Sequence, residues 1–119
     1  METATVCPVA STLELIGGKY KALILWHLSE NTLRFSELKK VIPGATPKLL
    51  TQQLRELESQ ELLCRTVYPV IPPKVEYSLT ELGKSLLPIL VAMRDWGADY
   101  LKQKNIESTC VMMSQDPLA

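Results

Sequence analysis

The chain has 119 residues, of which 46% are hydrophobic and 22% are charged, and its formal net charge at pH 7 is zero. This length predicts one domain, and the composition excludes an intrinsically disordered chain. Apolar runs such as Ala22 to Trp26 are far shorter than the roughly 20 residues that cross a bilayer, and the N-terminus lacks a basic, hydrophobic leader, so we expect a cytoplasmic protein.

Positive charge is concentrated in the middle of the chain. Residues 31–79 contain seven Lys or Arg against five Asp or Glu, whereas the preceding segment has two against three and the following segment four against five. Because the net charge is zero, any argument for a nucleic-acid partner has to rest on this middle segment.

The N-terminal half is predicted to be helical. A first helix is expected from Pro8 to about Ile16, because proline suits the first turn of a helix, where its missing N–H has no partner. Gly17 and Gly18 then end it. The apolar residues between Lys19 and Ser29 predict a second, largely buried helix.

A pair of helices separated by a turn is predicted next. Leu33 to Phe35 is a candidate very short strand, and Ser36 is the expected N-cap of a third helix that ends before Pro43-Gly44. Thr46-Pro47 combines a capping hydroxyl with proline at the first helical position, so a fourth helix should begin there and run through Ser59.

The fourth helix has two clearly different faces. Leu50, Leu54 and Leu57 recur at helical spacing and should face a core. The opposite side is polar. Its members are Lys48, Thr51, Gln52 and Arg55.

A β-hairpin and a long helix complete the chain. Leu63 to Tyr68 and Val75 to Leu79 favour strands, and the proline-rich segment 69–74 between them favours a turn. Thr80 should cap a last helix, kinked at Pro88. Its apolar stripe comprises Leu82, Leu86, Leu90, Met93, Gly97 and Leu101. A helix reaching Lys104 would span roughly 37 Å at about 1.5 Å per residue, so part of its stripe needs a second partner.

This order of elements predicts a mainly α fold with a small β-hairpin (α+β), that is, a winged helix-turn-helix with terminal dimerisation helices. Residues 1–104 should form the single domain, and residues 105–119 a flexible C-terminal tail. The fourth helix would enter the major groove of double-stranded DNA, where Lys48 and Arg55 can contact phosphate or guanine, Gln52 adenine, and Thr51 a thymine methyl or a phosphate. The residues expected on the DNA backbone are Arg34, Ser36, Lys39 and Lys74. The expected dimer-interface residues are Leu86, Leu90, Met93, Trp96 and Leu101.

The sequence from Cys7 to about Tyr100 resembles the HxlR-type winged-helix regulators, which are relatives of the MarR-like repressors. The matching pieces are Cys7-Pro8-Val9, Gly17-Gly18-Lys19, Phe35-Ser36-Glu37-Leu38, Ile42-Pro43-Gly44, Leu49-Leu50-Thr51, Leu54 to Glu58, Tyr68-Pro69, Pro72 to Thr80 and Trp96-Gly97. The resemblance implies a transcriptional regulator that dimerises through its terminal helices and binds palindromic operators. It also implies that the helix from Thr46 to Ser59 reads DNA and that the hairpin around Pro72-Pro73-Lys74 is the wing.

Two positions depart from the family pattern. Val70 stands where the family usually has an acidic residue, which alters the wing. Glu61 stands where it usually has glycine, which predicts a helix end without the usual left-handed glycine cap. Neither change removes a DNA-contacting side chain, so both bear on affinity and operator choice.

The three cysteines are too widely spaced for a disulfide framework or a CxxC zinc site. Cys7 precedes Pro8 at a helix N-terminus, where the dipole favours the thiolate, and in some members of the similar family the matching cysteine senses electrophiles or oxidants. Cys7 is therefore the redox-sensing candidate, and the alternative is a half-buried packing residue near the dimer seam. Cys64 is expected in the core, and Cys110 is expected to be accessible.

Neither an enzyme nor a cofactor or metal site is predicted. Gly17-Gly18-Lys19 lacks the spacing of a phosphate-binding loop, and Tyr20 stands where a hydroxyl ligand would be needed. His27, the only histidine, is expected on a helix surface and supports neither a metal cluster nor a catalytic triad. Two other functions remain open: a winged-helix module that binds protein and not DNA, and a thiol enzyme using Cys7. The sequence identifies no small-molecule effector and leaves open whether one exists.

Overall fold

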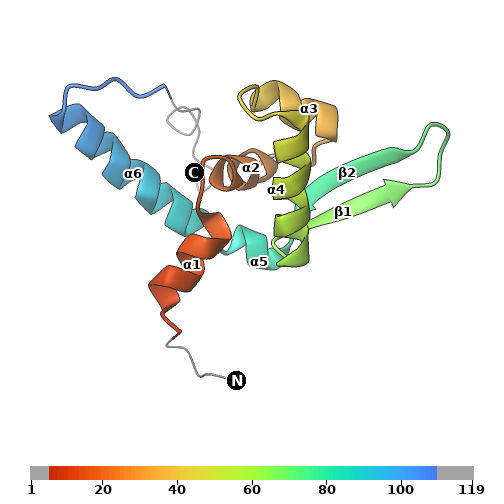
Figure 1. The fold of residues 1–119 in the computed structure, drawn as a ribbon, viewed down its shortest axis with the longest axis horizontal. Coiled ribbons are helices and arrows are strands. Elements are labelled where there is room, and N and C mark those ends of the chain that lie inside the picture. Colours follow the sequence, from red (N-terminus) through yellow and green to blue (C-terminus); the bar gives the residue numbers. More distant parts are fainter. Residues whose placement is uncertain (1–5, 110–119) are drawn as a thin grey trace.

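A computed structural model describes residues 6–109, in which a group of helices carries a projecting two-stranded hairpin (Figure 1). The elements are α1 (Pro8–Ile16), α2 (Lys21–Leu28), α3 (Phe35–Val41), α4 (Pro47–Ser59), β1 (Leu63–Tyr68), β2 (Lys74–Leu79), α5 (Glu81–Lys84) and α6 (Leu87–Gln103). This confirms the predicted mainly helical fold with a small hairpin. The strands pair antiparallel, from Leu63 opposite Leu79 to Tyr68 opposite Lys74.

The core is built around α2. Ile24, Leu25 and Trp26 are fully buried there, because almost every position of this helix meets another element. Leucines from α3, α4, β1 and α6 pack around them. Each large side chain removed from water in this way contributes about 1.5–3 kcal/mol, so the core fixes how α3 and α4 sit relative to each other.

The third helix begins earlier than predicted. Arg34, not Ser36, is its N-cap, because the Glu37 carboxylate accepts a hydrogen bond from the Arg34 backbone N–H at 2.8 Å. The predicted short strand is reduced to one residue. Leu33 exchanges backbone hydrogen bonds with Tyr77 at 3.0 and 2.8 Å, whereas Phe35 is already helical.

The predicted single C-terminal helix is wrong, because the segment forms two helices. Thr80 caps α5 as expected, with its Oγ1 accepting from the Gly83 N–H at 3.0 Å. Pro88 lies in the first turn of α6 and does not kink a continuous helix. The proline ring would clash with a carbonyl group one turn earlier in a continuous helix, so the helix starts here. The missing N–H of Pro88 costs no hydrogen bond in a first turn. The 17 residues of α6 span about 26 Å.

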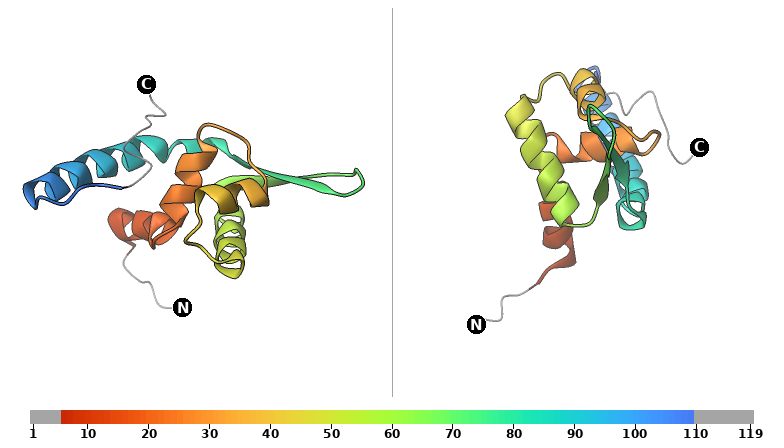
Figure 2. Two further views of the ribbon diagram at one scale, coloured as in Figure 1. Left: turned by 90° about the horizontal axis from the view of Figure 1, so that it is seen from above. Right: turned by 90° about the vertical axis from the view of Figure 1, so that its right-hand side faces the viewer.

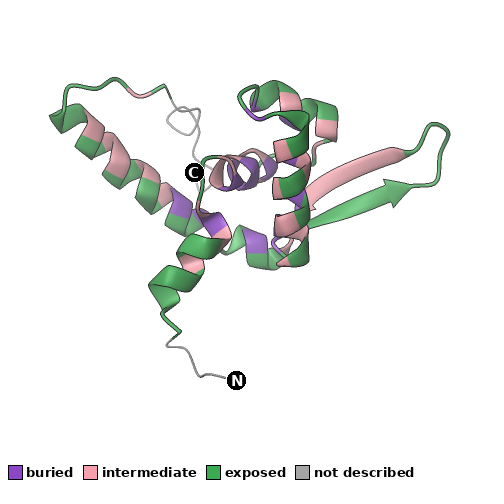
Figure 3. Ribbon diagram, in the orientation of Figure 1, coloured by how far each residue is buried: buried purple, intermediate pink, exposed green. Residues whose placement is uncertain are grey.

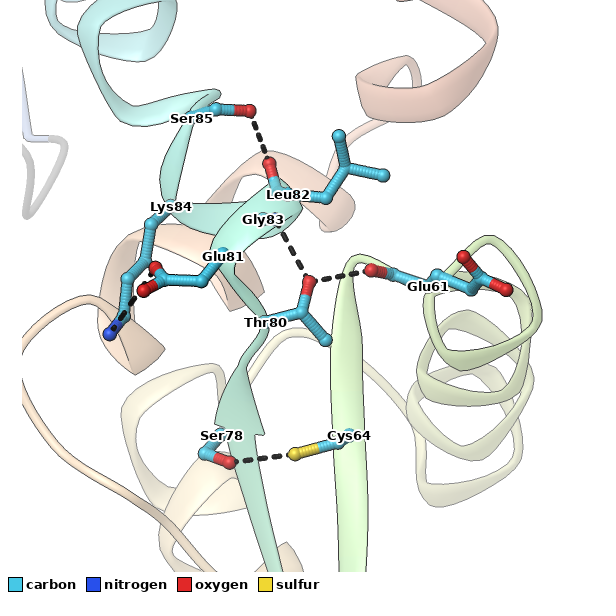
Figure 4. Close-up of polar contacts among 9 residues, drawn as sticks. All are labelled: Glu61, Cys64, Ser78, Thr80, Glu81, Leu82, Gly83, Lys84 and Ser85. Carbon is cyan, nitrogen blue, oxygen red and sulfur yellow. Dashed lines mark hydrogen bonds and ion pairs between the residues drawn. The ribbon is translucent and has the colours of Figure 1, made fainter.

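The end of α4 also corrects the sequence analysis. Glu61 adopts a left-handed φ of 63° although it is not glycine. Two backbone bonds close the helix there, from Glu61 N to Glu58 O and from Leu62 N to Leu57 O, both 3.0 Å. They form the Schellman motif. Figure 4 shows that the Thr80 hydroxyl also donates to the Glu61 carbonyl oxygen, at 2.5 Å.

Helices α1 and α6 and the hairpin extend away from the core (Figure 2). The radius of gyration is 15.8 Å, larger than the about 13 Å expected for a compact domain of this length. Much of α1 and of the distal part of α6 is exposed or half-buried (Figure 3). Asn105, the first residue of the predicted tail, follows the C-cap Lys104 of α6 and has a left-handed φ of 58°. Among residues 6–109, no helix has the length and apolar character needed to cross a membrane.

Candidate nucleic-acid interface

Helix α4 presents a polar face to solvent. Thr46 caps it by accepting from the Leu49 N–H at 3.1 Å, and Pro47 occupies its first turn. Three leucines fix its rotation. Leu50, Leu54 and Leu57 are at most 2% exposed. The opposite residues Lys48, Gln52 and Arg55 are exposed and Thr51 is half-buried, as the periodicity predicts.

The residues of this face line a shallow groove. Its walls are Pro47, Lys48, Thr51, Gln52, Arg55 and Glu56, and its volume is about 670 Å³. A smaller hollow of about 200 Å³ separates α4 from the hairpin, and Thr51 and Arg55 border both. Arg55 therefore lies between the polar face of α4 and the hairpin. Its side chain borders both the groove and the smaller hollow.

Arg65 on β1 belongs to this surface, and the sequence analysis missed it. Its Nε lies 3.5 Å from Glu58 Oε1 on α4, and Arg65 is opposite Tyr77 in the strand register. Burial raises the pKa of Tyr77, and Arg65 and Arg55 oppose that rise. The alternation of side chains along the strand could have identified Arg65. Leu63 faces the core, so Arg65, two residues later, lies on the same face of the hairpin.

Three of the four predicted backbone-contact residues come together. Arg34, Ser36 and Lys74 line a hollow of about 500 Å³ between the start of α3 and the hairpin tip. Lys39 lies elsewhere, in the last turn of α3, where its Nζ donates to the Pro43 carbonyl oxygen at 3.2 Å.

The charge of Lys74 is partly balanced within the hairpin. Its Nζ lies 3.4 Å from Glu76 Oε2 and 5.0 Å from the centre of the Tyr68 ring. A hydrogen bond to Glu76 and the charge of that carboxylate raise the pKa of Tyr68. Lys74 therefore contributes less positive potential than an isolated lysine would.

A second surface, apolar in character, joins α1 and α6. We name it the α1–α6 face. Its exposed members are Val9, Leu13, Ile89, Met93, Trp96 and Tyr100. The Trp96 and Tyr100 rings stack with centroids 5.5 Å apart. A groove of about 350 Å³ runs between the two helices.

Burial separates the residues expected at a dimer interface into two groups. Leu86 and Leu90 are 7% and 2% exposed and belong to the protomer's own core, so they offer almost no surface to a partner. Leu101 is half-buried and lines a different cavity. Met93 and Trp96 remain. Ile89 and Tyr100 are also exposed, and the spacing 89, 93, 96, 100 places them on the same side of α6, although neither was among the expected residues.

Cys7 and Cys64 are both exposed, so the expectation that Cys64 lies in the core is wrong. Side chains alternate along a strand, and Leu63 takes the inward position. The Cys64 sulfur lies 3.0 Å from Ser78 Oγ (Figure 4). Cys7 is the N-cap of α1 and makes no side-chain cap hydrogen bond. Cys110 lies outside the described residues.

His27 is half-buried and not a surface residue, because it packs beside a cavity of about 600 Å³ between α2, the turn before α4 and the end of α6. Its Nε2 is buried without a hydrogen-bond partner. Burial lowers the pKa of His27, and the charge of Glu30 opposes this. No group of three or more metal-binding side chains occurs within residues 6–109.

Helices α3 and α4, joined by a tight turn and followed by a hairpin, define a winged helix-turn-helix transcriptional regulator of the MarR-like type. The sequence model of the HxlR-like helix-turn-helix family matches residues 15–105. The chain belongs to that family, as the resemblance implied. Its members are transcriptional regulators and not enzymes.

Individual relatives agree with this assignment. The uncharacterised HTH-type transcriptional regulator YdeP of Bacillus subtilis is 51% identical over 94 residues, covering 79% of this chain and 73% of YdeP. The oxidised form of the redox regulator HypR superposes with a TM-score of 0.74 at 47% identity, covering 78% of this chain and 96% of HypR. A MarR-family transcriptional regulator from Porphyromonas gingivalis also has a TM-score of 0.74, at 36% identity, covering 82% and 95% of the two chains.

Proposed function

We propose that the protein is a cytoplasmic homodimer that binds a pseudo-palindromic double-stranded DNA operator and regulates transcription by occupying it. The observation that supports this most strongly is the rotation of α4. Three leucines anchor one side of the helix in the core, so Lys48, Thr51, Gln52 and Arg55 project from the other. An α-helix carrying such side chains fits the major groove, where they can hydrogen-bond base edges and phosphates.

The α1–α6 face supports the dimer. Trp96 is 70% exposed and Val9 is 67% exposed, which is unusual for large apolar side chains grouped on adjoining helices. A second copy would cover the face and place two α4 helices on one side of a duplex. Half-sites would then lie about one helical turn, roughly 34 Å, or a multiple of it apart.

Selection from a random-sequence DNA library tests this function. The protein should retain a defined subset of duplexes, and the affinity should fall steeply with salt, because several lysines and arginines replace counterions at phosphates. Arg55→Ala should weaken binding to the selected duplex by about 1–3 kcal/mol if Arg55 reads a base, whereas Lys84→Ala, on exposed α5, should not.

An alternative function, a winged-helix module that binds protein, predicts that no duplex is selected at all. The polar face of α4 argues for DNA, because a protein-binding surface is usually depleted of charge at its centre. A flat salt dependence or an unselective pool after repeated selection would favour the alternative.

We further propose that Cys7 makes DNA binding responsive to oxidants. The relative HypR is a redox regulator, and Cys7 is an exposed thiol at a helix N-terminus, directly before the first residue of the α1–α6 groove. Modification of this sulfur would add bulk or charge at the edge of the proposed dimer interface.

Hydrogen peroxide treatment, followed by measurement of affinity for the selected duplex, tests the role of Cys7. Oxidant should change the affinity of the wild-type protein and of Cys64→Ser, and leave Cys7→Ser unaffected. An equal response in all three proteins would exclude Cys7 as the sensor.

A further inference from the structure

Lys21 is the one charged side chain that counts as buried among residues 6–109, with 9% of its surface exposed. It is the first residue of α2. A cation at that end of a helix is opposed by the helix dipole, and a buried ammonium is unfavourable unless it is paired. The helix start therefore does not favour a lysine at position 21. A buried lysine here needs a partner of opposite charge.

The partner is Glu56, in the middle of α4. Lys21 Nζ lies 3.2 Å from Glu56 Oε2, and the Gln53 amide donates to the same oxygen at 3.4 Å. The ion pair links α2 to α4, two helices that pack directly against each other. Glu56 is not itself buried, because 42% of its side chain is exposed.

Glu56 also forms part of the surface proposed to meet DNA. It is the acidic wall of the groove otherwise lined by Pro47, Lys48, Thr51, Gln52 and Arg55. A carboxylate that turned into this groove would repel phosphates. It would also compete for the hydrogen-bond donors of Gln52 and Arg55, the side chains best suited to read base edges.

We propose that Lys21 is a positioning residue for DNA recognition, because its buried ammonium holds the Glu56 carboxylate on the α2 side of α4 and neutralises it there. The proposal rests on the proposed DNA-binding function. It assigns Lys21 a role in binding although its side chain is buried beneath the surface that contacts DNA.

The test compares two variants with a matched control. Lys21→Met replaces the buried ammonium with an apolar side chain of similar length and leaves a solvated carboxylate at position 56. Lys21→Met combined with Glu56→Gln also removes that carboxylate. Lys84→Met is the control, since it removes one positive charge from a solvent-exposed pair with Glu81 on α5 (Figure 4). Glu56→Gln alone is avoided, because it leaves the lysine buried and unpaired.

Each protein is titrated with a duplex selected by the wild-type protein and with random-sequence duplex, at low and high salt, after urea unfolding shows that it is folded. Lys21→Met should bind the selected duplex about tenfold more weakly than Lys84→Met at low salt, with a smaller deficit at high salt, because screening weakens the repulsion. The double variant should recover most of the lost affinity.

The outcomes distinguish a positioning role of Lys21 from a purely structural one. A purely structural pair would make both Lys21 variants lose affinity alike, in step with their stability and at every salt concentration, and that result overturns the proposal. So does a folded Lys21→Met that binds like the control. If the wild-type protein selects no duplex, the proposed function itself is wrong, and the Lys21 proposal is overturned with it.

Discussion

Glu61 has a backbone conformation that glycine would adopt at a lower cost in free energy. Its φ of 63° lies in the left-handed region, which costs a residue with a Cβ about 1–2 kcal/mol. Glycine removes that cost but loses about 0.4–1 kcal/mol by enlarging the entropy of the unfolded chain. Glu61→Gly should therefore raise the free energy of unfolding by about 0.5–1 kcal/mol.

The other interactions at this helix end survive the substitution, because they involve only backbone atoms of residue 61. The bond from its N–H to Glu58 O and the bond from the Thr80 hydroxyl to its carbonyl oxygen are both retained. No ion pair of the Glu61 side chain occurs within residues 6–109. The predicted rise in the free energy of unfolding should therefore not be offset by a lost contact.

Urea unfolding at one fixed protein concentration measures the change, since the stability of the proposed dimer would depend on concentration. Asn105→Gly is the control, because Asn105 follows the C-cap of α6 with a similar φ of 58° and asparagine tolerates that conformation far better than glutamate. A loss of stability in Glu61→Gly, or an equal gain in both variants at unchanged slope, would refute the reasoning.

Three further predictions concern the core, the half-buried histidine and the proposed dimer. Gly83→Ala should destabilise the protein by about 1–3 kcal/mol or more, because a Cβ there would lie 2.0 Å from the Leu62 carbonyl oxygen; a variant with wild-type urea stability contradicts this. Burial lowers the pKa of His27 below its ordinary value of 6.5, so the unfolded chain binds the proton more readily, and stability should be full above that pH and decline as pH falls through the lowered value. His27→Gln should flatten this decline, and a parallel pH profile would exclude His27 as its cause. Trp96→Ala should weaken dimerisation about tenfold or more in sedimentation equilibrium, whereas Val67→Ala, at an exposed apolar site on the hairpin, should not; equal dissociation constants would place the interface elsewhere.

Local signals in the sequence were sufficient for much of the fold. Pro8, Thr46 and Pro47 start helices by their own backbone chemistry, and the leucines of α4 fix its faces by spacing alone. The hairpin follows from two strand-forming runs separated by prolines. The polar face of α4, the centre of the candidate site, was therefore predictable.

The remaining features depend on contacts between distant segments. Glu61 is held in a left-handed conformation partly by Thr80, and no local rule predicts that for a glutamate. Leu86 and Leu90 looked like interface residues because their spacing marks an apolar stripe, but spacing does not say whether the protomer or a partner covers it. The pairing of Lys21 with Glu56 depends on the packing of α2 against α4, which no local pattern in the sequence predicts.

Dimethyl sulfate protection of a selected duplex tests the central claim most directly, because the reagent methylates the guanine N7 that faces the major groove. If two copies of α4 read DNA, the wild-type protein should protect guanines in two major-groove segments on one side of the duplex, about one helical turn or a multiple of it apart. Arg55→Ala should reduce the protection in both segments. Protection confined to one segment, or two segments on opposite sides of the duplex, would contradict the account.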